Sequence, residues 1–162
     1  MNIRKATDAD LSVVLSLRDK AREIMRHSGN PDQWPIGYPK ESVFAKDINE
    51  GNCYIIEDED GASVATFSFI PGQDITYQTI KGEWLDDELP YYTIHRIASN
   101  GACSGIFQTI IDFCSSRTNN IRIDTHRDNA IMRHLLSHTG FSYCGIIWLA
   151  NGEERLAFQK LF

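Results

Sequence analysis

The stretch of this sequence best suited to chemistry spans residues 95–114, HRIASNGACSGIFQTIIDFC. A strand-like run breaks at a turn that carries Gly101 and Gly105, and an amphipathic helical pattern begins directly after it. The first turn of a helix leaves several N–H groups free and carries roughly half a positive charge, so such a turn suits a bound phosphate. Glycine supplies unusual backbone angles, and Ser104 adds a hydroxyl. A turn that only connects a strand to a helix is the alternative, and it is the commoner case.

The four cysteines do not suggest a metal site. Cys53, Cys103, Cys114 and Cys144 are widely spaced and form no C-x-x-C pair, so we expect no zinc and mostly reduced, buried thiols. Cys103 differs because it lies just before a predicted helix start, where the peptide dipoles favour a thiolate.

Length and charge exclude several classes of function. A chain of 162 residues is long enough to form one domain, 1–162, with its own core. Its net charge of −6 argues against nucleic-acid or acidic-membrane partners, which select a basic face. The charged N-terminal stretch lacks the apolar core of a signal peptide, and no run approaches the roughly 20 apolar residues of a membrane span. We therefore expect a cytoplasmic protein.

Apolar periodicity and turn residues predict alternating strands and helices. Strands are expected at 2–6, 52–58, 62–70, 91–99, 120–126, 142–150 and 154–162, and helices from about 8 to 27 and at 40–51, 105–117 and 128–141. Asp60-Gly61 predicts a hairpin, whereas residues 71–89 read as an insertion. The order predicts an α/β (α+β) fold with a mixed sheet and helices on both faces. Such sheets bind ligands at the carboxyl ends of strands, which here points to residues 99–107.

This order of elements resembles the GCN5-related N-acetyltransferase (GNAT) superfamily over essentially the whole chain. The resemblance rests on IHRIAS followed by the glycine-bearing turn and helix, and on IRIDTHRDNAIMRHLLSHTGF followed by a strand. It implies the acyl-CoA N-acyltransferase fold, with a mostly antiparallel sheet and a splayed parallel strand pair. It also implies acetyl-CoA as co-substrate, no metal, and direct transfer of the acetyl group to an amine in a ternary complex. A GNAT-fold protein that only binds or senses a metabolite is the alternative.

The resemblance also implies which residues contact acetyl-CoA. The family's Q/R-x-x-G-x-G/A loop falls on residues 102–107 with Gly105 as its first glycine, so Ala102 and Phe107 depart from the motif. Leu136 occupies the place of a tyrosine that protonates the departing thiolate in many members. Asn129 is expected to contact the cofactor, to cap its helix, or to do both. The expected cofactor-binding residues are Ile97, Ala98, Ser99, Gly101, Ser104, Gly105, Ile106, Phe107 and Asn129.

Acetyl transfer to an amine also requires a catalytic base and a site for the acceptor. Family members often carry a glutamate where this chain has Thr93, so His95, two residues further on the same strand face, is the proposed catalytic base. Asp124 and His126 are alternatives, and a structural role for His95 stays open. Trp34 and Tyr38 are expected either to form an aromatic wall for the acceptor or to plug the core. The expected partner is a small-molecule or peptide amine, and the fold also suggests a homodimer.

Overall fold

The computed structural model describes all residues 1–162 and contains one eight-stranded sheet of order β1-β2-β3-β5-β6-β8-β7-β4. The strands are β1 (Asn2–Lys5), β2 (Cys53–Glu57), β3 (Ser63–Pro71), β4 (Lys81–Gly82), β5 (Tyr92–Ser99), β6 (Asn120–Thr125), β7 (Ser142–Trp148) and β8 (Glu154–Leu161). The helices are α1 (Leu11–His27), α2 (Glu41–Asn49), α3 (Ile106–Ser115) and α4 (Ala130–His138), with one-turn 3₁₀ helices η1 (Asp8–Asp10) and η2 (Ile75–Tyr77). Only β5 and β6 pair in parallel. The predicted fold class is confirmed.

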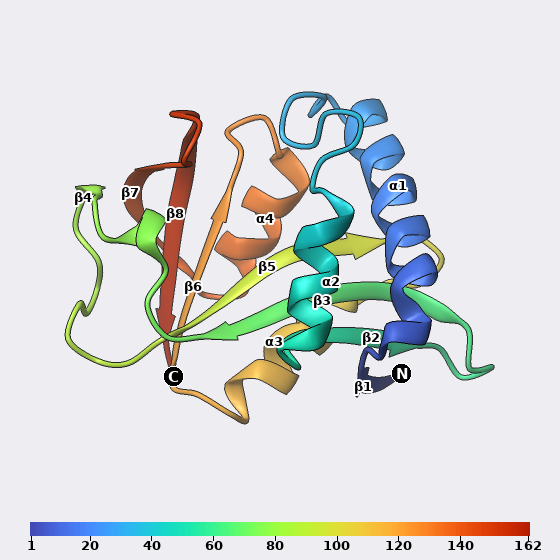
Figure 1. Ribbon diagram of the computed structural model, residues 1–162. Coiled ribbons are helices and arrows are strands. Elements are labelled where there is room, and N and C mark those ends of the chain that lie inside the picture. The colour runs from blue at the N-terminus through green and yellow to red at the C-terminus, as the bar shows by residue number, and fades with distance from the viewer.

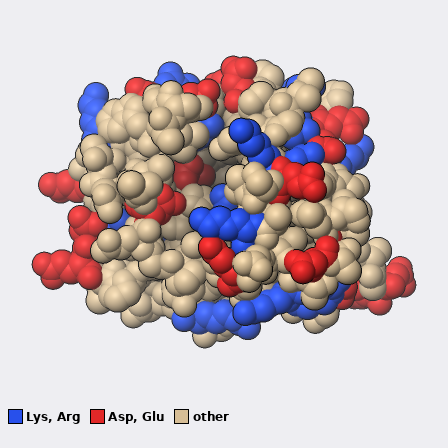
Figure 2. Space-filling model, in the orientation of Figure 1, with Lys and Arg blue, Asp and Glu red and all other residues tan.

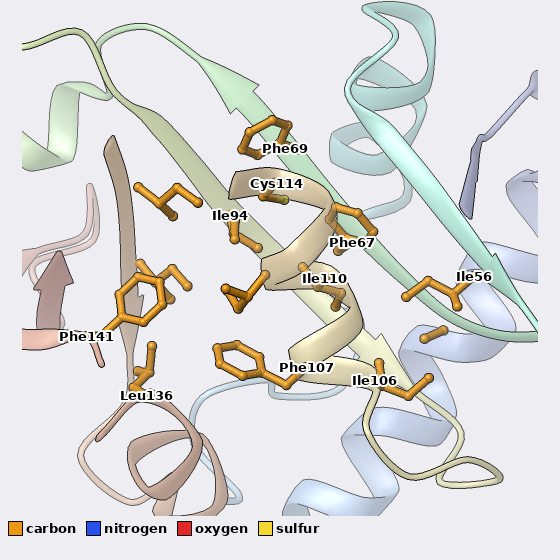
Figure 3. Close-up of a cluster of buried hydrophobic side chains, with 14 of the residues drawn as sticks. Ile56, Phe67, Phe69, Ile94, Ile106, Phe107, Ile110, Cys114, Leu136 and Phe141 are labelled. Carbon is orange, nitrogen blue, oxygen red and sulfur yellow. The ribbon is translucent and has the colours of Figure 1, made fainter. Parts of the chain in front are cut away.

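Helices cover both faces of the sheet (Figure 1). On one face, α1 and α2 pack on β2 and β5 through two apolar clusters that contain Val14, Phe44 and Ile55 in one and Leu17 and Ala98 in the other. On the opposite face, α3 and α4 share a larger cluster with the sheet (Figure 3). Burial of this apolar area on both faces is the main force that holds the layers together.

Strands β5 and β6 separate soon after they meet. Their parallel pairing covers only Tyr92 with Ile121 and Thr93 with Arg122. Beyond Thr93 that edge of β5 has no strand partner, and a gap opens between the two strands toward their carboxyl ends. The splayed pair implied by the family resemblance is therefore present.

A bulge in β5 redirects the strand at the gap. Ser68 of β3 pairs with His95, and Thr66 pairs with Ala98, so Arg96 and Ile97 together face one residue, Phe67. Arg96 has φ 54°, an unusual angle for a residue with a side chain. The bulge inserts one extra residue into β5, and the alternation of side chains resumes after it. No glycine lies in this part of the strand to indicate a bulge from the sequence.

The expected insertion at 71–89 is a packed layer on the sheet. Tyr77, Trp84 and Tyr91 are buried together with Cys144 and Ile147. The strand β4 was not predicted. It pairs with β7 at a close approach where a Cβ on Gly82 would lie 2.1 Å from the Cys144 carbonyl oxygen.

None of the helices has both the length and the apolar character needed to cross a bilayer.

Candidate active site

The turn between β5 and α3 leaves its backbone N–H groups free from residue 103 onward. The Gly101 N–H donates to Ser99 Oγ at 3.1 Å, and the Ala102 N–H donates to Asn100 Oδ1 at 2.9 Å. The N–H groups of residues 103–108 donate to no acceptor in the protein, and the first helical bond runs from the Thr109 N–H to the Gly105 carbonyl. Gly105 has φ 75°, and no atom lies within 4 Å of where its Cβ would be. Free donors thus gather at the start of a ten-residue helix, beside a glycine whose Cβ position is open.

This turn borders a cavity of about 510 Å³ between α3, α4 and α1. Phe107 does not fill it, because the residue is 5% exposed and its ring points into the core toward Leu136 of α4 and Phe141 (Figure 3). The lining is largely apolar and includes no lysine or arginine. Among the expected cofactor-binding residues, those that line the cavity are Ile97, Ser99, Gly101, Gly105, Ile106, Phe107 and Asn129.

Two of the expected cofactor-binding residues do not line this cavity. Ala98 lies on the opposite face of β5, buried against Leu17 and Trp34, so its side chain cannot reach the cavity. Ser104 is exposed and outside the lining, although its N–H is among the free ones. Residues of α4 that we did not anticipate, Met132 and Leu135, form the facing wall. They follow Asn129 at helical spacing, a signal that was available in the sequence.

Asn129 caps α4 and faces the cavity at the same time. Its Oδ1 accepts the Met132 N–H at 3.0 Å, which confirms the predicted N-cap. Its Nδ2 donates to Gln33 Oε1 at 2.9 Å, and Asn30 Nδ2 donates to the same oxygen at 2.9 Å. The segment between α1 and α2 is thereby tied to the start of α4.

A second cavity of about 250 Å³ adjoins the first at the gap between β5 and β6. Both are bordered by Met25, Ile97, Asn129 and Met132. The second cavity has lining residues from both faces of the splayed strands, among them Ile94, His95, Ile123 and Asp124. Figure 2 shows a hollow near the centre of the face that carries α1 and α2, with acidic and basic side chains at its walls. The two cavities therefore lie side by side at the gap between the splayed strands.

His95 lies in the second cavity between two carboxylates. Its Nε2 is 2.8 Å from Asp74 Oδ2, and its Nδ1 is 3.9 Å from Asp124 Oδ2. Asp74 is itself fixed, since its Oδ1 accepts the Thr76 N–H and hydroxyl at 2.9 and 2.7 Å. Burial alone would raise the pKa of Asp74, but the hydrogen bonds from His95 and Thr76 outweigh burial and lower the pKa to about 2. Asp74 is therefore an ionised acceptor for the ring at neutral pH.

Asp124 is fixed by a buried tyrosine. The Tyr77 hydroxyl donates to Asp124 Oδ2 at 2.6 Å. Burial, followed by the negative charge of Asp124, raises the pKa of Tyr77 well above its usual value, so its hydroxyl keeps its proton. Asp124 Oδ1 makes no hydrogen bond within the protein.

The arginines of this cavity already have carboxylate partners. Arg96 donates from Nε and Nη2 to the two oxygens of Asp47 at 2.7 and 2.9 Å. The guanidinium of Arg155 contacts Glu153 Oε2 at 3.3 Å. The charges of Asp74 and Asp124 thus have no arginine or lysine partner.

Other expected residues take structural or peripheral positions. Trp34 is 6% exposed and packs on α1, so it plugs the core while its edge lines the second cavity, whereas Tyr38 is 41% exposed at the rim. His126 is outside both cavities, and its Nδ1 accepts the Asp128 N–H at 3.0 Å. Leu136 is fully buried and cannot supply an acid. The acidic residues of the segment 71–89, Glu83, Asp86, Asp87 and Glu88, line neither cavity.

Comparisons with solved structures place the chain in a family. A GNAT-family acetyltransferase from Streptococcus agalactiae is 30% identical, with a TM-score of 0.88 over 99% of this chain and 95% of that one. A GNAT-family acetyltransferase from Listeria monocytogenes is 21% identical, with a TM-score of 0.75 over 99% and 94% of the two chains. A ribosomal-protein-alanine N-acetyltransferase from Brucella melitensis, 18% identical, has a TM-score of 0.65 over both full chains. No family model and no curated protein matches the sequence. The chain belongs to the GNAT family of acetyltransferases.

Proposed function

We propose that this protein is an acetyl-CoA-dependent N-acetyltransferase that moves an acetyl group directly to a primary amine of a small molecule or peptide. The observation that carries the proposal is the set of free N–H groups at residues 103–108, gathered at the start of α3 where the Cβ position of Gly105 is open. Such donors suit the CoA diphosphate, and the apolar cavity beyond them suits the pantetheine arm. The residues present therefore fit the co-substrate despite the altered motif.

The bound co-substrate would supply an acetyl thioester at the gap between β5 and β6. The edge of β5 beyond Thr93 has no strand partner, so its N–H groups are available to polarise the thioester carbonyl. The adjoining cavity would hold the amine on the far side of the gap. Holding the two reactants in adjoining cavities accounts for a large part of the expected rate through proximity.

His95 takes the proton from the amine in this proposal. An amine with a pKa near 10 is protonated at neutral pH and cannot attack until it loses a proton. Because ionised Asp74 accepts the Nε2–H of His95, the Nδ1 lone pair stays free to take that proton. Asp74 is a positioning residue for this base.

The transfer then balances without a further group. The neutral amine attacks the carbonyl carbon, a C–N bond forms, and the C–S bond breaks with its electron pair on sulfur. The second amine proton passes to the sulfur, and His95 returns the first proton to water. Leu136 offers no acid for this step, but a thiol pKa of about 8.5 makes thiolate a fair leaving group without one.

Calorimetric titration with acetyl-CoA tests the proposal. We expect micromolar binding that Gly105→Tyr abolishes, because the ring would occupy the space in front of the free N–H groups. Gly152→Tyr is the matched control, since Gly152 also has a positive φ and open space around its Cβ position but lies in the β7–β8 turn. Thiol release after addition of amines supports the transferase. Loss of binding in both variants, or no binding by the unaltered protein, contradicts the proposal.

A binding or sensing module is the second candidate, favoured by the residues at positions 102, 107 and 136 and by a cavity lining without lysine or arginine. Binding of acetyl-CoA without thiol release from any amine would support it.

A further inference from the structure

We propose that the cavity around Asp124 is an acceptor subsite for a primary ammonium group that has no carboxylate next to it, with Asp124 Oδ1 as the group that binds the ammonium. This inference rests on the proposed function and names the class of acceptor. It follows from the hydrogen bonds, the buried polar groups and the charges of the cavity.

The orientation of Asp124 is the first observation. The Tyr77 hydroxyl occupies Oδ2, and His95 Nδ1 lies 3.9 Å from that same oxygen. Oδ1 has no partner in the protein, and the residue lines the cavity. A carboxylate held at one oxygen and free at the other is prepared to accept a hydrogen bond from a charged donor.

A buried hydroxyl next to Asp124 is the second, independent observation. Thr125 lines the same cavity and is 1% exposed, yet its Oγ1 has no hydrogen-bond partner. A buried polar group without a partner costs free energy, and such groups in folded proteins are rare. A polar group of a bound ligand at the gap between the splayed strands would satisfy it.

The charge balance decides between an ammonium and a carboxylate. Arg96 and Arg155 border the cavity, but Asp47 and Glu153 already neutralise them. The negative charges of Asp74 and Asp124 are not compensated by arginine or lysine. A cation is therefore favoured here, whereas a carboxylate beside the amine would meet like charge in a partly desolvated space.

The geometry also connects binding to the proposed proton transfer. An ammonium on Asp124 Oδ1 would lie next to the ring of His95, whose Nδ1 is the free acceptor. Asp124 then binds the acceptor, and His95 takes its proton. Tyr77 is a positioning residue that acts through Asp124.

The test uses two pairs of probes that differ only by a carboxylate, phenethylamine with phenylalanine and cadaverine with lysine. Thiol release in the presence of acetyl-CoA gives kcat and KM for each. We expect the amines to exceed the amino acids at least about tenfold in kcat/KM, because the carboxylate of the amino acid would meet the negative charges of Asp74 and Asp124 in a partly desolvated space. Asp124→Asn should raise KM for the amines by about tenfold, the loss expected for one charge-assisted hydrogen bond, and reduce the preference, with a smaller change in kcat. Tyr77→Phe should give an intermediate loss.

Asp87→Asn is the matched control, because Asp87 is a carboxylate that binds an arginine, Arg122, outside the cavity. It should leave the preference unchanged. Amino acids that react as well as the amines overturn the subsite, as does an Asp124→Asn variant that behaves like Asp87→Asn. In either case thiol release still supports the proposed function.

If the proposed function is wrong, the result is different: the protein does not bind acetyl-CoA, and no probe causes thiol release. The subsite is then decided by ligand-detected NMR with phenethylamine and phenylalanine alone. Binding of the amine only, lost in Asp124→Asn, supports the subsite; no binding, or equal binding of both, overturns it.

Discussion

The two adjoining cavities are lined by different kinds of chemical groups. The cavity beside α3 presents main-chain N–H groups and apolar side chains, whereas the cavity around His95 presents charged side chains fixed by one another. A surface of main-chain donors depends on the path of the backbone and tolerates changes of side chain. A surface of charged side chains depends on each residue. This difference explains how the loop at residues 102–107 can depart from the family motif while its donors remain free.

Removal of His95 should have the largest effect and acts only on the side-chain cavity. We expect His95→Ala to lower kcat by about 10² to 10⁴, because general base catalysis is lost. Acetyl-CoA affinity should be unchanged, since His95 does not border the cavity beside α3. Steady-state kinetics and calorimetry measure the two quantities. Equal kcat in the variant would assign His95 a structural role only.

Restoring the family glycine at position 107 should damage the protein. Phe107 packs in the large core cluster with Ile110 and Leu136, and its ring points toward Leu136. Phe107→Gly removes a buried ring and should lower the free energy of unfolding by about 3–5 kcal/mol, with a further cost for glycine in a helix. Urea unfolding followed by circular dichroism measures the loss. If the variant binds acetyl-CoA more tightly at unchanged stability, residue 107 belongs to the diphosphate site after all.

The Asp74→Asn variant separates the effect of orienting His95 on kcat from the effect of having the base at all. The amide can donate to His95 Nε2 as well as accept from it, so the tautomer with a free Nδ1 is no longer fixed. We expect kcat to fall at least about tenfold, less than in His95→Ala, with unchanged affinity for acetyl-CoA. In a His95→Ala background the same substitution should have no further effect on kcat. An equal loss in both backgrounds would show that Asp74 acts independently of the ring.

The lowered pKa of Asp74 adds a pH-dependent readout to the same variant. Its folded pKa of about 2 lies below the usual 3.8, so the ionised form stabilises the fold above about pH 4. That contribution is lost as the pH falls from about 4 to 2. The difference in the free energy of unfolding between the wild type and Asp74→Asn should therefore shrink over this window. A difference that stays constant with pH would contradict the assigned pKa.

The sequence predicted the elements of this fold better than the contacts of its site. Apolar spacing placed the helices and most strands within a few residues, whereas Phe107, expected among the cofactor contacts, is largely buried in the core. The Asp74–His95 and Tyr77–Asp124 pairs join residues 21 and 47 positions apart, through a segment that showed no periodicity. The bulge at Arg96 could not be predicted, because no glycine marks this position in the sequence. Polar residues that meet across a sheet depend on strand order, which local patterns do not encode.

Restoring the family residue at position 102, the other position that departs from the motif, should have the smallest effect on acetyl-CoA affinity. Ala102 is exposed, and its side chain lies in a shallow site with Lys20 and Asn100 on the α1 side of the loop, outside the cavity beside α3. A long side chain at this position would extend into solvent, so Ala102→Arg should change acetyl-CoA affinity by no more than about twofold, within the range of a surface substitution. Calorimetry at two salt concentrations checks this, because an arginine that reached the diphosphate would add a salt-dependent gain. Such a gain would show that side chains as well as main-chain N–H groups hold the co-substrate, and the contrast between the two cavities would weaken accordingly.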